Sequence, residues 1–223
     1  MVQNRLQRPG LVANGAAIRR STSACALLVF LLLGLTALPP AVTGAAESPT
    51  AVVRHTTDAV LAVLADTNLT ADQKRHEIEQ IVYAHFDFRT LSRLVLARNW
   101  KRLTPPQQTD FVEEFKKHLS LTYGKNVERY NNERAIVLSD RQEPGGDWTV
   151  KTKVVRPTAS DFRVDYRLRK RHGEWRVIDV IVEGVSLVAN YRSQFQEIVS
   201  NEGPAKLIER LHEKNASGEG LKT

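Results

Sequence analysis

Cysteine is nearly missing from this sequence of 223 residues, because Cys25 is the only one. Cys25 also lies at the start of an apolar run that we interpret as part of an export signal. After export the chain would have no disulfide, no thiol nucleophile and no cysteine metal ligand. Its stability must then come from an apolar core, and roughly 175 residues suffice to bury about 70% of the surface of the unfolded chain.

Acidic residues are missing from residues 1–46, where four arginines precede an apolar run from Cys25 to Leu38. Two prolines end the run, and small residues follow. This order of a basic, an apolar and a small-residue region is typical of a signal peptide. A run of about 14 residues is also shorter than the roughly 20 that cross a bilayer as a helix. We therefore expect cleavage after Ala45 or Ala46 and a periplasmic protein; an uncleaved membrane anchor is the alternative.

A large net charge is also missing once this segment is removed. The four arginines account for more than half of the formal net charge of +7, which falls to +3 for residues 47–223. The remaining cations are interspersed with acids, whereas a nucleic-acid-binding domain usually has a concentrated basic face. The sequence therefore argues against nucleic-acid binding.

The first half of the exported chain has apolar residues at helical spacing and four helix-start signals. Ser48-Pro49 can cap a first helix, and Thr70–Gln73 forms a capping box for a second. Asp87 can cap a third helix, and Thr104–Gln107 repeats the capping pattern at the start of the longest one. One face of that longest helix is apolar at every fourth position: Phe111, Phe115, Leu119, Tyr123 and Val127.

After Asn132 the spacing of apolar residues changes from helical to alternating, which predicts strands. In the third predicted strand all the apolar side chains lie on one face of the sheet. They are Phe162, Val164, Tyr166 and Leu168. The four predicted strands are Ala135–Asp140, Trp148–Arg156, Phe162–Arg169 and Trp175–Val182.

A closing helical region follows Gly184 and carries Leu187, Tyr191 and Phe195 at helical spacing. Gly203-Pro204 ends it and begins a short helix through Leu211. N-terminal helices, a four-stranded antiparallel sheet and closing helices describe an α+β fold in which the sheet wraps around helices. We predict a single domain over residues 47–214 and a flexible polar tail over residues 215–223.

Motifs for catalysis or metal binding are missing as well. The six histidines have no paired spacing such as H-E-x-x-H, so no metal site is predicted. Gly184–Ser186 begins like a nucleophile elbow, but Val188 replaces the second glycine of that motif, and Ser186 fits a helix cap better. His85 and Asp87 could serve a pocket as acid and base, although residues two apart point in different directions. We predict no catalytic residue.

Three stretches of the sequence resemble the MlaC family, also called toluene-tolerance auxiliary proteins. The resemblance covers residues 86–211, and the last stretch, which ends in Tyr-Arg-Ser-Gln-Phe, is the most specific. The stretches are Phe86–Arg89, Leu94–Trp100 with the following Thr104-Pro105, and Asp179–Phe195.

This resemblance implies a fold and a function. Proteins of the family have a nuclear-transport-factor-like roll with added helices, and they hold phospholipid tails between sheet and helices. They pass glycerophospholipid, as cargo and without a cofactor, between an outer-membrane Mla lipoprotein complex and an inner-membrane Mla ABC transporter. The resemblance therefore implies a non-enzymatic periplasmic carrier that maintains outer-membrane lipid asymmetry, and we expect a monomer. The alternatives are a small-molecule enzyme with the same roll and a ligand-free exported adaptor.

The three largest apolar faces should converge on the lipid-binding pocket, because a sheet that wraps around helices brings them together. The predicted lining residues are Phe111, Phe115, Leu119, Tyr123, Phe162, Val164, Tyr166, Leu168, Leu187, Tyr191 and Phe195.

A basic cluster at a predicted hairpin tip is the candidate docking site for an acidic protein surface or anionic head groups. The alternative is a solvated turn whose charges prevent edge-to-edge aggregation. The cluster consists of Arg167, Arg169, Lys170 and Arg171.

Overall fold

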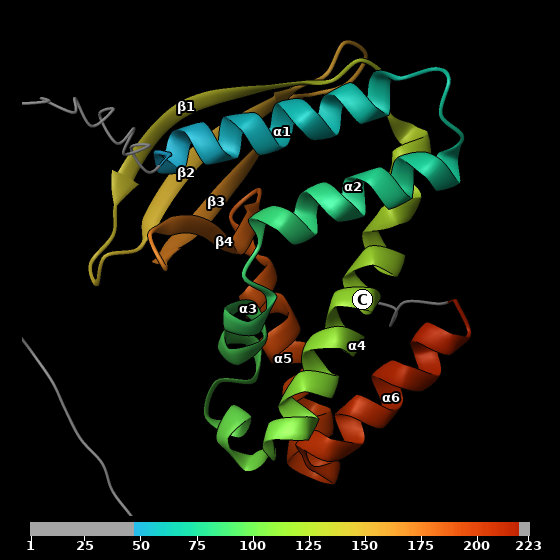
Figure 1. The fold of residues 1–223 in the computed structure, drawn as a ribbon, viewed down its shortest axis with the longest axis vertical. Helices are drawn as coiled ribbons and strands as arrows, with labels where there is room; N and C mark the ends of the chain where they lie inside the picture. The colour runs from blue at the N-terminus through green and yellow to red at the C-terminus, as the bar shows by residue number, and fades with distance from the viewer. Residues whose placement is uncertain (1–46, 219–223) are drawn as a thin grey trace, which may run out of the picture. The chain divides into compact units, whose positions relative to one another are not determined.

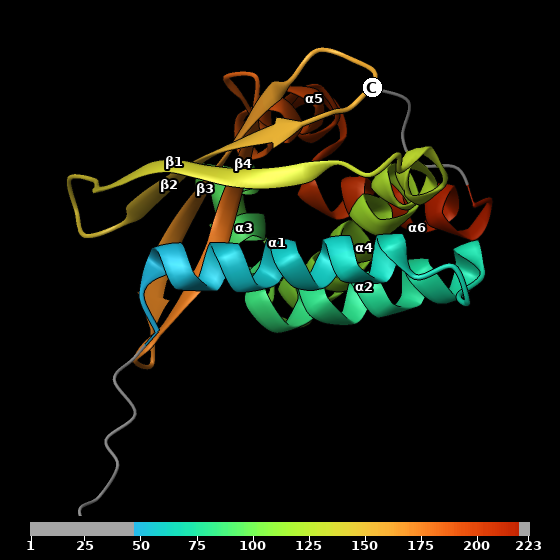
Figure 2. The same cartoon turned by 90° about the horizontal axis from the view of Figure 1, so that it is seen from above.

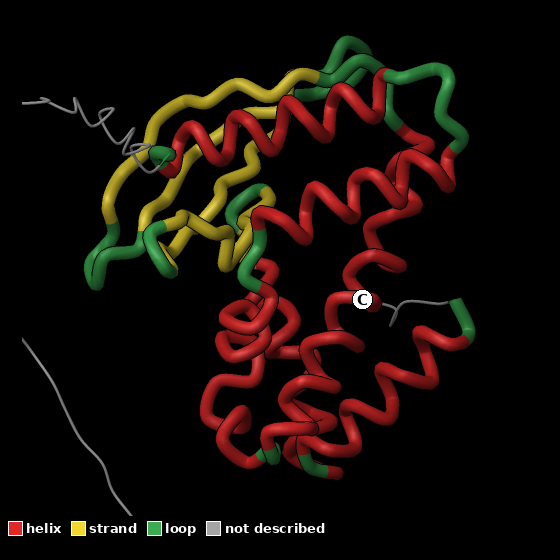
Figure 3. The backbone as a smooth tube through the Cα atoms, viewed as in Figure 1, coloured by secondary structure: helices red, strands yellow, loops and turns green. Residues whose placement is uncertain are grey.

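The computed structural model describes residues 47–218. The predicted signal peptide, residues 1–46, lies outside the described residues, as do residues 219–223. Six α-helices and two 3₁₀ helices precede or follow the strands, as Figure 1 shows along the chain and Figure 3 shows by type. They are α1 (Pro49–Ala65), α2 (Ala71–His85), α3 (Phe88–Leu96), η1 (Ala97–Arg102), α4 (Pro105–Tyr123), η2 (Gly124–Arg129), α5 (Leu187–Glu202) and α6 (Pro204–Ala216).

The strands form one antiparallel sheet in sequence order, which confirms the predicted α+β class. A fifth strand is added to the four predicted ones. It forms because Glu183 and Gly184 have positive φ angles of 49° and 81°, which make a two-residue turn that folds the chain back onto β4. The strands are β1 (Arg134–Gln142), β2 (Trp148–Val155), β3 (Phe162–Arg171), β4 (Glu174–Val182) and β5 (Val185–Ser186).

The predicted helix caps are present. Ser48 Oγ accepts a hydrogen bond from the backbone N–H of Ala51 at 3.1 Å, and Asp87 Oδ1 accepts one from Thr90 at 2.8 Å. Capping boxes begin α2 and α4. Ser186 caps α5 at 3.0 Å from the nitrogen of Ala189, which agrees with its interpretation as a cap rather than a nucleophile.

Two separate apolar cores hold the described residues together. The helical core is built by α3, η1, α4, α5 and α6 around aromatic side chains of α4 and α5. The sheet core lies between α1 and the face of the sheet made by β2, β3 and β4. Figures 1 and 2 show α1 lying along this face of the sheet, with α2 running beside α1.

The last helix is longer than predicted. It continues past Leu211 to Ala216, and Asn215 is buried, at 4% exposed. The Asn215 amide donates to the backbone oxygen of Glu114 at 2.8 Å and to its carboxylate at 2.7 Å, which fixes the end of α6 against α4. In the described residues no helix combines the length and the apolar character that a membrane crossing requires.

Candidate functional site

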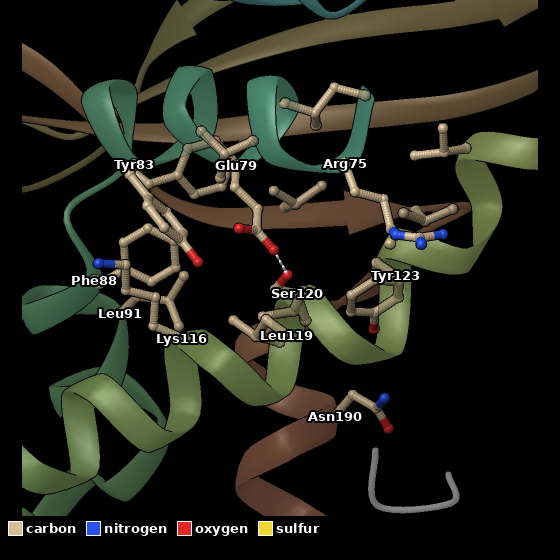
Figure 4. Close-up of a pocket in the computed structure, with 18 of the residues that line it drawn as sticks. Arg75, Glu79, Tyr83, Phe88, Leu91, Lys116, Leu119, Ser120, Tyr123 and Asn190 are labelled. Carbon is tan, nitrogen blue, oxygen red and sulfur yellow. Dashed lines mark hydrogen bonds between the residues drawn. The ribbon is translucent and has the colours of Figure 1, made fainter. Parts of the chain in front are cut away.

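An apolar pocket of about 470 Å³ lies between α2, α3, α4 and the end of the sheet. Figure 4 shows α2 above it, α4 below it and a strand behind it. The pocket lies where the two cores diverge, so its walls come from both. Its lining residues are Arg75, Ile78, Glu79, Val82, Tyr83, Phe86, Phe88, Leu91, Lys116, Leu119, Ser120, Tyr123, Gly124, Val127, Val180, Val182, Val185, Leu187 and Asn190.

The wall contributed by α2 comes from a helix that contains no buried residue. Ile78 and Val82 are only half-buried, because they face the pocket instead of a packed neighbour. An amphipathic helix normally buries its apolar face. The incomplete burial of α2 is therefore the structural feature that distinguishes this wall from core packing.

Polar contacts join α2 to α4 and η2 along one edge of the pocket. Arg75, Glu79 and Tyr83 are spaced four residues apart on α2, so they share one face of the helix. We call their contacts the polar bridge. Arg75 forms an ion pair with Glu128 at 3.5 Å, Glu79 accepts a hydrogen bond from the Ser120 hydroxyl, and the Tyr83 ring contacts Lys116 (Figure 4).

The electrostatics of the polar bridge follow from its partial burial. Burial, and after it the nearby Glu79 and Glu113 carboxylates, raises the pKa of the Tyr83 hydroxyl. Lys116 Nζ lies 3.7 Å from Glu113, so its charge is balanced by that carboxylate as well as by the ring face. The polar bridge is thus a line of mutually paired groups beside an apolar interior.

The pocket also has an apolar opening. Three of its lining residues rank among the exposed large hydrophobic residues of the described chain, namely Tyr123 at 44%, Val182 at 44% and Val185 at 61% exposed. Val182 and Val185 flank the tight turn between β4 and β5. Exposed apolar side chains around an apolar pocket are typical of a site that accepts an apolar ligand.

Three of the eleven predicted lining residues border this pocket: Leu119, Tyr123 and Leu187. Four others, Phe111, Phe115, Tyr191 and Phe195, belong to the helical core with their rings in mutual contact. The apolar face of α4 divides because its first half packs against α5 and α6 and only its second half reaches the pocket. The role of the four core aromatics as ligand contacts stays a prediction.

The predicted face of β3 lies elsewhere. Leu168 is fully buried in the sheet core with Tyr166 packed against that core, while Val164 is 8% exposed and Phe162 stacks under Arg156. Burial raises the pKa of the Tyr166 hydroxyl to about 12. These β3 residues therefore do not line this pocket, since Leu168 packs with Val52 and Val53 of α1 in the sheet core. Their role as ligand contacts stays a prediction. The strand wall of the pocket comes instead from Val180 and Val182 of β4.

The sequence pattern does not predict the contribution of α2, α3 and β4 to the pocket. Ile78 and Val82 lie four residues apart, which indicates one face of a helix but not what covers that face. The low apolar content of α2 is the signal in the sequence that could have indicated the pocket. A helix with so few apolar residues cannot pack fully against a core.

The basic cluster of β3 is largely neutralised by acids. Arg169 forms two hydrogen bonds of 2.7 Å with the Asp147 carboxylate. Arg167 lies 3.5 Å from the buried Asp179, and Arg171 lies 3.6 Å from Asp87. Lys170 lies over the Trp175 ring at 5.9 Å. These contacts connect β3 to its surroundings, and the docking role of the cluster stays a prediction.

The alternative acid–base pair does not assemble. Asp87 caps α3, while burial, and after it the charge of the neighbouring His55, lowers the pKa of His85. His85 lies beside the His55 ring, with 6.2 Å between ring centres, and lines a different cavity from the apolar pocket. Among residues 47–218, no group of three or more His, Cys, Asp and Glu side chains is placed to hold a metal ion.

Comparisons with known proteins agree on one family. The family model described as MlaC protein matches residues 54–213. The toluene tolerance protein ttg2D of Pseudomonas putida is 29% identical over 182 residues, which cover 77% of this chain and 82% of that protein. A phospholipid-binding protein from Ralstonia solanacearum, solved in complex with a phospholipid, is similar with a TM-score of 0.68 and 26% identity. That match covers 76% of this chain and 97% of the solved one.

Proposed function

Because this chain belongs to the MlaC family, we propose that it is a phospholipid carrier that holds acyl tails in the apolar pocket between α2, α4 and β4. The observation that supports this most directly is a pocket of about 470 Å³ with a predominantly apolar lining, in a fold similar to that of a protein solved with a phospholipid. The tails would contact Leu119, Tyr123 and Leu187 together with residues of α2 and β4.

The energetics of acyl tails require such a pocket. Each methylene group transferred out of water gains roughly 0.8 kcal/mol, so about thirty of them gain roughly 25 kcal/mol. A carrier must therefore keep the tails out of water with an apolar surface, so that removing them from a membrane does not cost this free energy. The volume of about 470 Å³ lies in the lower half of the usual range for ligand pockets, roughly 300 to 1,000 Å³. Two full tails would need more room, which separation of α2 from α4 would provide.

We further propose that the protein acts in the periplasm and passes glycerophospholipid between the inner-membrane Mla ABC transporter and the outer-membrane Mla lipoprotein complex. Such transfer would maintain outer-membrane lipid asymmetry. The family match and the similarity to a phospholipid-binding protein support transport rather than catalysis. The basic cluster from Arg167 to Arg171 remains the proposed docking site for a partner complex.

Lipid extraction tests the carrier function. Native mass spectrometry of protein purified from cells should show bound phospholipid, and delipidated protein should take phospholipid up from vesicles. Absence of both would contradict the carrier function. A ligand-free adaptor would give that result, whereas an enzyme with this roll would convert a ligand instead of releasing it unchanged.

A further inference from the structure

Residues 88–109 depart from the mixed charge pattern expected for the exported chain. They contain Arg89, Arg93, Arg98, Lys101 and Arg102 but no aspartate or glutamate. Residues 47–223 have a net charge of only +3, so these five cations exceed the whole net charge of that part of the chain. All five side chains are exposed, and we call them the basic patch.

The local geometry gathers the basic patch on a rigid base. Arg89 and Arg93 are four residues apart in α3, and Arg98 and Lys101 are three apart in the 3₁₀ helix η1, so each pair shares one helix face. The Arg89 guanidinium lies 5.5 Å from the centre of the Trp100 ring and thereby connects α3 to η1. Both elements bury apolar residues in the helical core, which holds them in place.

The cations of the basic patch have no acidic partner. None of them lies within ion-pair distance of a carboxylate in residues 47–218. Arg89 and Arg102 bond only to the uncharged amides of Gln108 and Asn99. The three arginines of the basic cluster on β3, Arg167, Arg169 and Arg171, differ, because each lies near an aspartate. A concentrated set of uncompensated cations attracts anionic surfaces.

The composition of the basic patch indicates which kind of anionic surface it fits. A stable protein interface usually has an apolar, desolvated centre surrounded by polar residues. The exposed large hydrophobic residues of the described chain all lie outside residues 88–109. A fluid layer of anionic head groups attracts a protein by charge alone. Each Lys or Arg near the surface contributes about one kcal/mol to this binding. We propose that the basic patch docks this protein on an anionic phospholipid bilayer.

The basic patch lies next to the apolar pocket. Phe88 and Leu91 of α3 line the apolar pocket, so the helix that carries Arg89 and Arg93 is also a wall of the pocket. A bilayer held by the patch therefore lies beside the helix that borders the pocket. Attachment by charge alone, without an inserted apolar anchor, is weak and reversible. This inference goes beyond the carrier function, since head groups bind the patch whether or not the pocket holds a lipid.

Flotation with lipid vesicles tests the proposal on residues 47–223. The protein should float with phosphatidylcholine vesicles that contain about 30% phosphatidylglycerol and not with pure phosphatidylcholine vesicles. Binding should be lost at about 1 M salt, where the Debye length is about 3 Å. The triple variant Arg93→Gln, Arg98→Gln and Lys101→Gln should bind roughly 100-fold more weakly, because each cation contributes about fivefold.

The triple variant should keep the fold intact, because these three side chains are exposed and form no hydrogen bond in the described part of the chain. A matched control removes the same charge from exposed residues of η2 and β1, namely Lys125→Gln, Arg129→Gln and Arg134→Gln. The control should retain most of the binding, and both variants should retain bound phospholipid in native mass spectrometry.

Three results would overturn the proposal: no flotation of the unsubstituted protein, equal loss in both triple variants, or undiminished binding of the patch variant. Suppose that the unsubstituted protein binds an Mla complex but not vesicles, and that the patch variant fails to bind the complex. The patch then recognises an acidic protein surface. If native mass spectrometry shows no phospholipid bound to the unsubstituted protein, the carrier function is contradicted. The flotation experiment would still decide whether the basic patch binds an anionic bilayer.

Discussion

The ammonium group of Lys116 lies 3.9 Å from the centre of the Tyr83 ring and joins α4 to α2 across one edge of the apolar pocket. Such a cation–π contact contributes about 0.5 to 2 kcal/mol, depending on its exposure. Together with the hydrogen bond from Ser120 to Glu79, it holds the two helices by side chains that are separate from both cores. Because α2 contains no buried residue, we expect these side-chain contacts to control the separation of α2 from α4.

Weakening the polar bridge should speed lipid exchange. The double variant Tyr83→Leu and Ser120→Ala removes two of its three contacts and should lower the free energy of unfolding by only about 1 to 2 kcal/mol. Delipidated protein should then take up phospholipid from vesicles faster than the unsubstituted protein. The control is Ser193→Ala, whose exposed hydroxyl bonds within its own helix. An unchanged uptake rate in the double variant would show that α2 and α4 do not separate during exchange.

Filling the pocket should exclude lipid at little cost in stability. Leu119 lines the pocket, so the larger side chain of Leu119→Trp can extend into empty space. Native mass spectrometry should show loss of phospholipid, while urea denaturation should show a change below about 1 kcal/mol. Val164→Trp is the matched control, because Val164 is 8% exposed and does not line the pocket, and overpacking there should cost about 1 to 3 kcal/mol. Lipid retained by Leu119→Trp would place the tails elsewhere.

Truncating a core aromatic should have the opposite effect. The Phe195 ring is 1% exposed and lies 5.5 Å from the Phe115 ring and 5.4 Å from the Tyr191 ring, measured between centres. Phe195→Ala should lower the free energy of unfolding by about 3 to 5 kcal/mol in a urea titration. The folded fraction should still bind phospholipid. Normal stability with lost lipid would instead support the sequence-based assignment of Phe195 as a lipid contact.

Exchanging the charges of the Arg169–Asp147 pair tests whether the basic cluster has a structural role or a docking role. Because Arg169 is about one-third exposed, Arg169→Asp should cost only about 1 kcal/mol, and adding Asp147→Arg should recover most of it. Urea titration measures the stability, and lipid transfer to an Mla complex measures docking. Recovery of stability with persistently slow transfer would assign the cluster to docking. Recovery of both would assign it to the fold.

Much of the fold could be predicted because its signals are local. A capping box such as Thr70 with Gln73 needs only a few neighbouring residues, and the alternation along β3 identifies the buried face of that strand. β5 was missed because a two-residue strand has no periodicity, and only the positive φ angles of Glu183 and Gly184 create it.

The pocket was harder to predict because it depends on where packing is incomplete. Phe115 and Leu119 are equivalent in the sequence pattern, yet one is fully buried in the helical core and the other borders the cavity. The difference arises from α5 and α6, which cover only part of α4. Periodicity identifies an apolar face, but it does not specify which partner covers that face.

The last prediction concerns acid stability. Burial lowers the pKa of the His118 imidazole from 6.5 to about 4, so this side chain is neutral in the folded protein near pH 7. Between pH 6.5 and 4 the unfolded chain binds the proton more strongly, and the free energy of unfolding falls as the pH falls through this window. The loss amounts to about 3 kcal/mol. The His118 ring lies 5.5 Å from the Tyr191 ring, so His118→Phe keeps an aromatic side chain there but cannot titrate. Relative to the unsubstituted protein, this variant should gain about 3 kcal/mol between pH 7 and pH 4 in urea titrations, whatever its stability at pH 7. A difference in stability that does not change with pH would show that the pKa of His118 is the same in the folded and the unfolded chain.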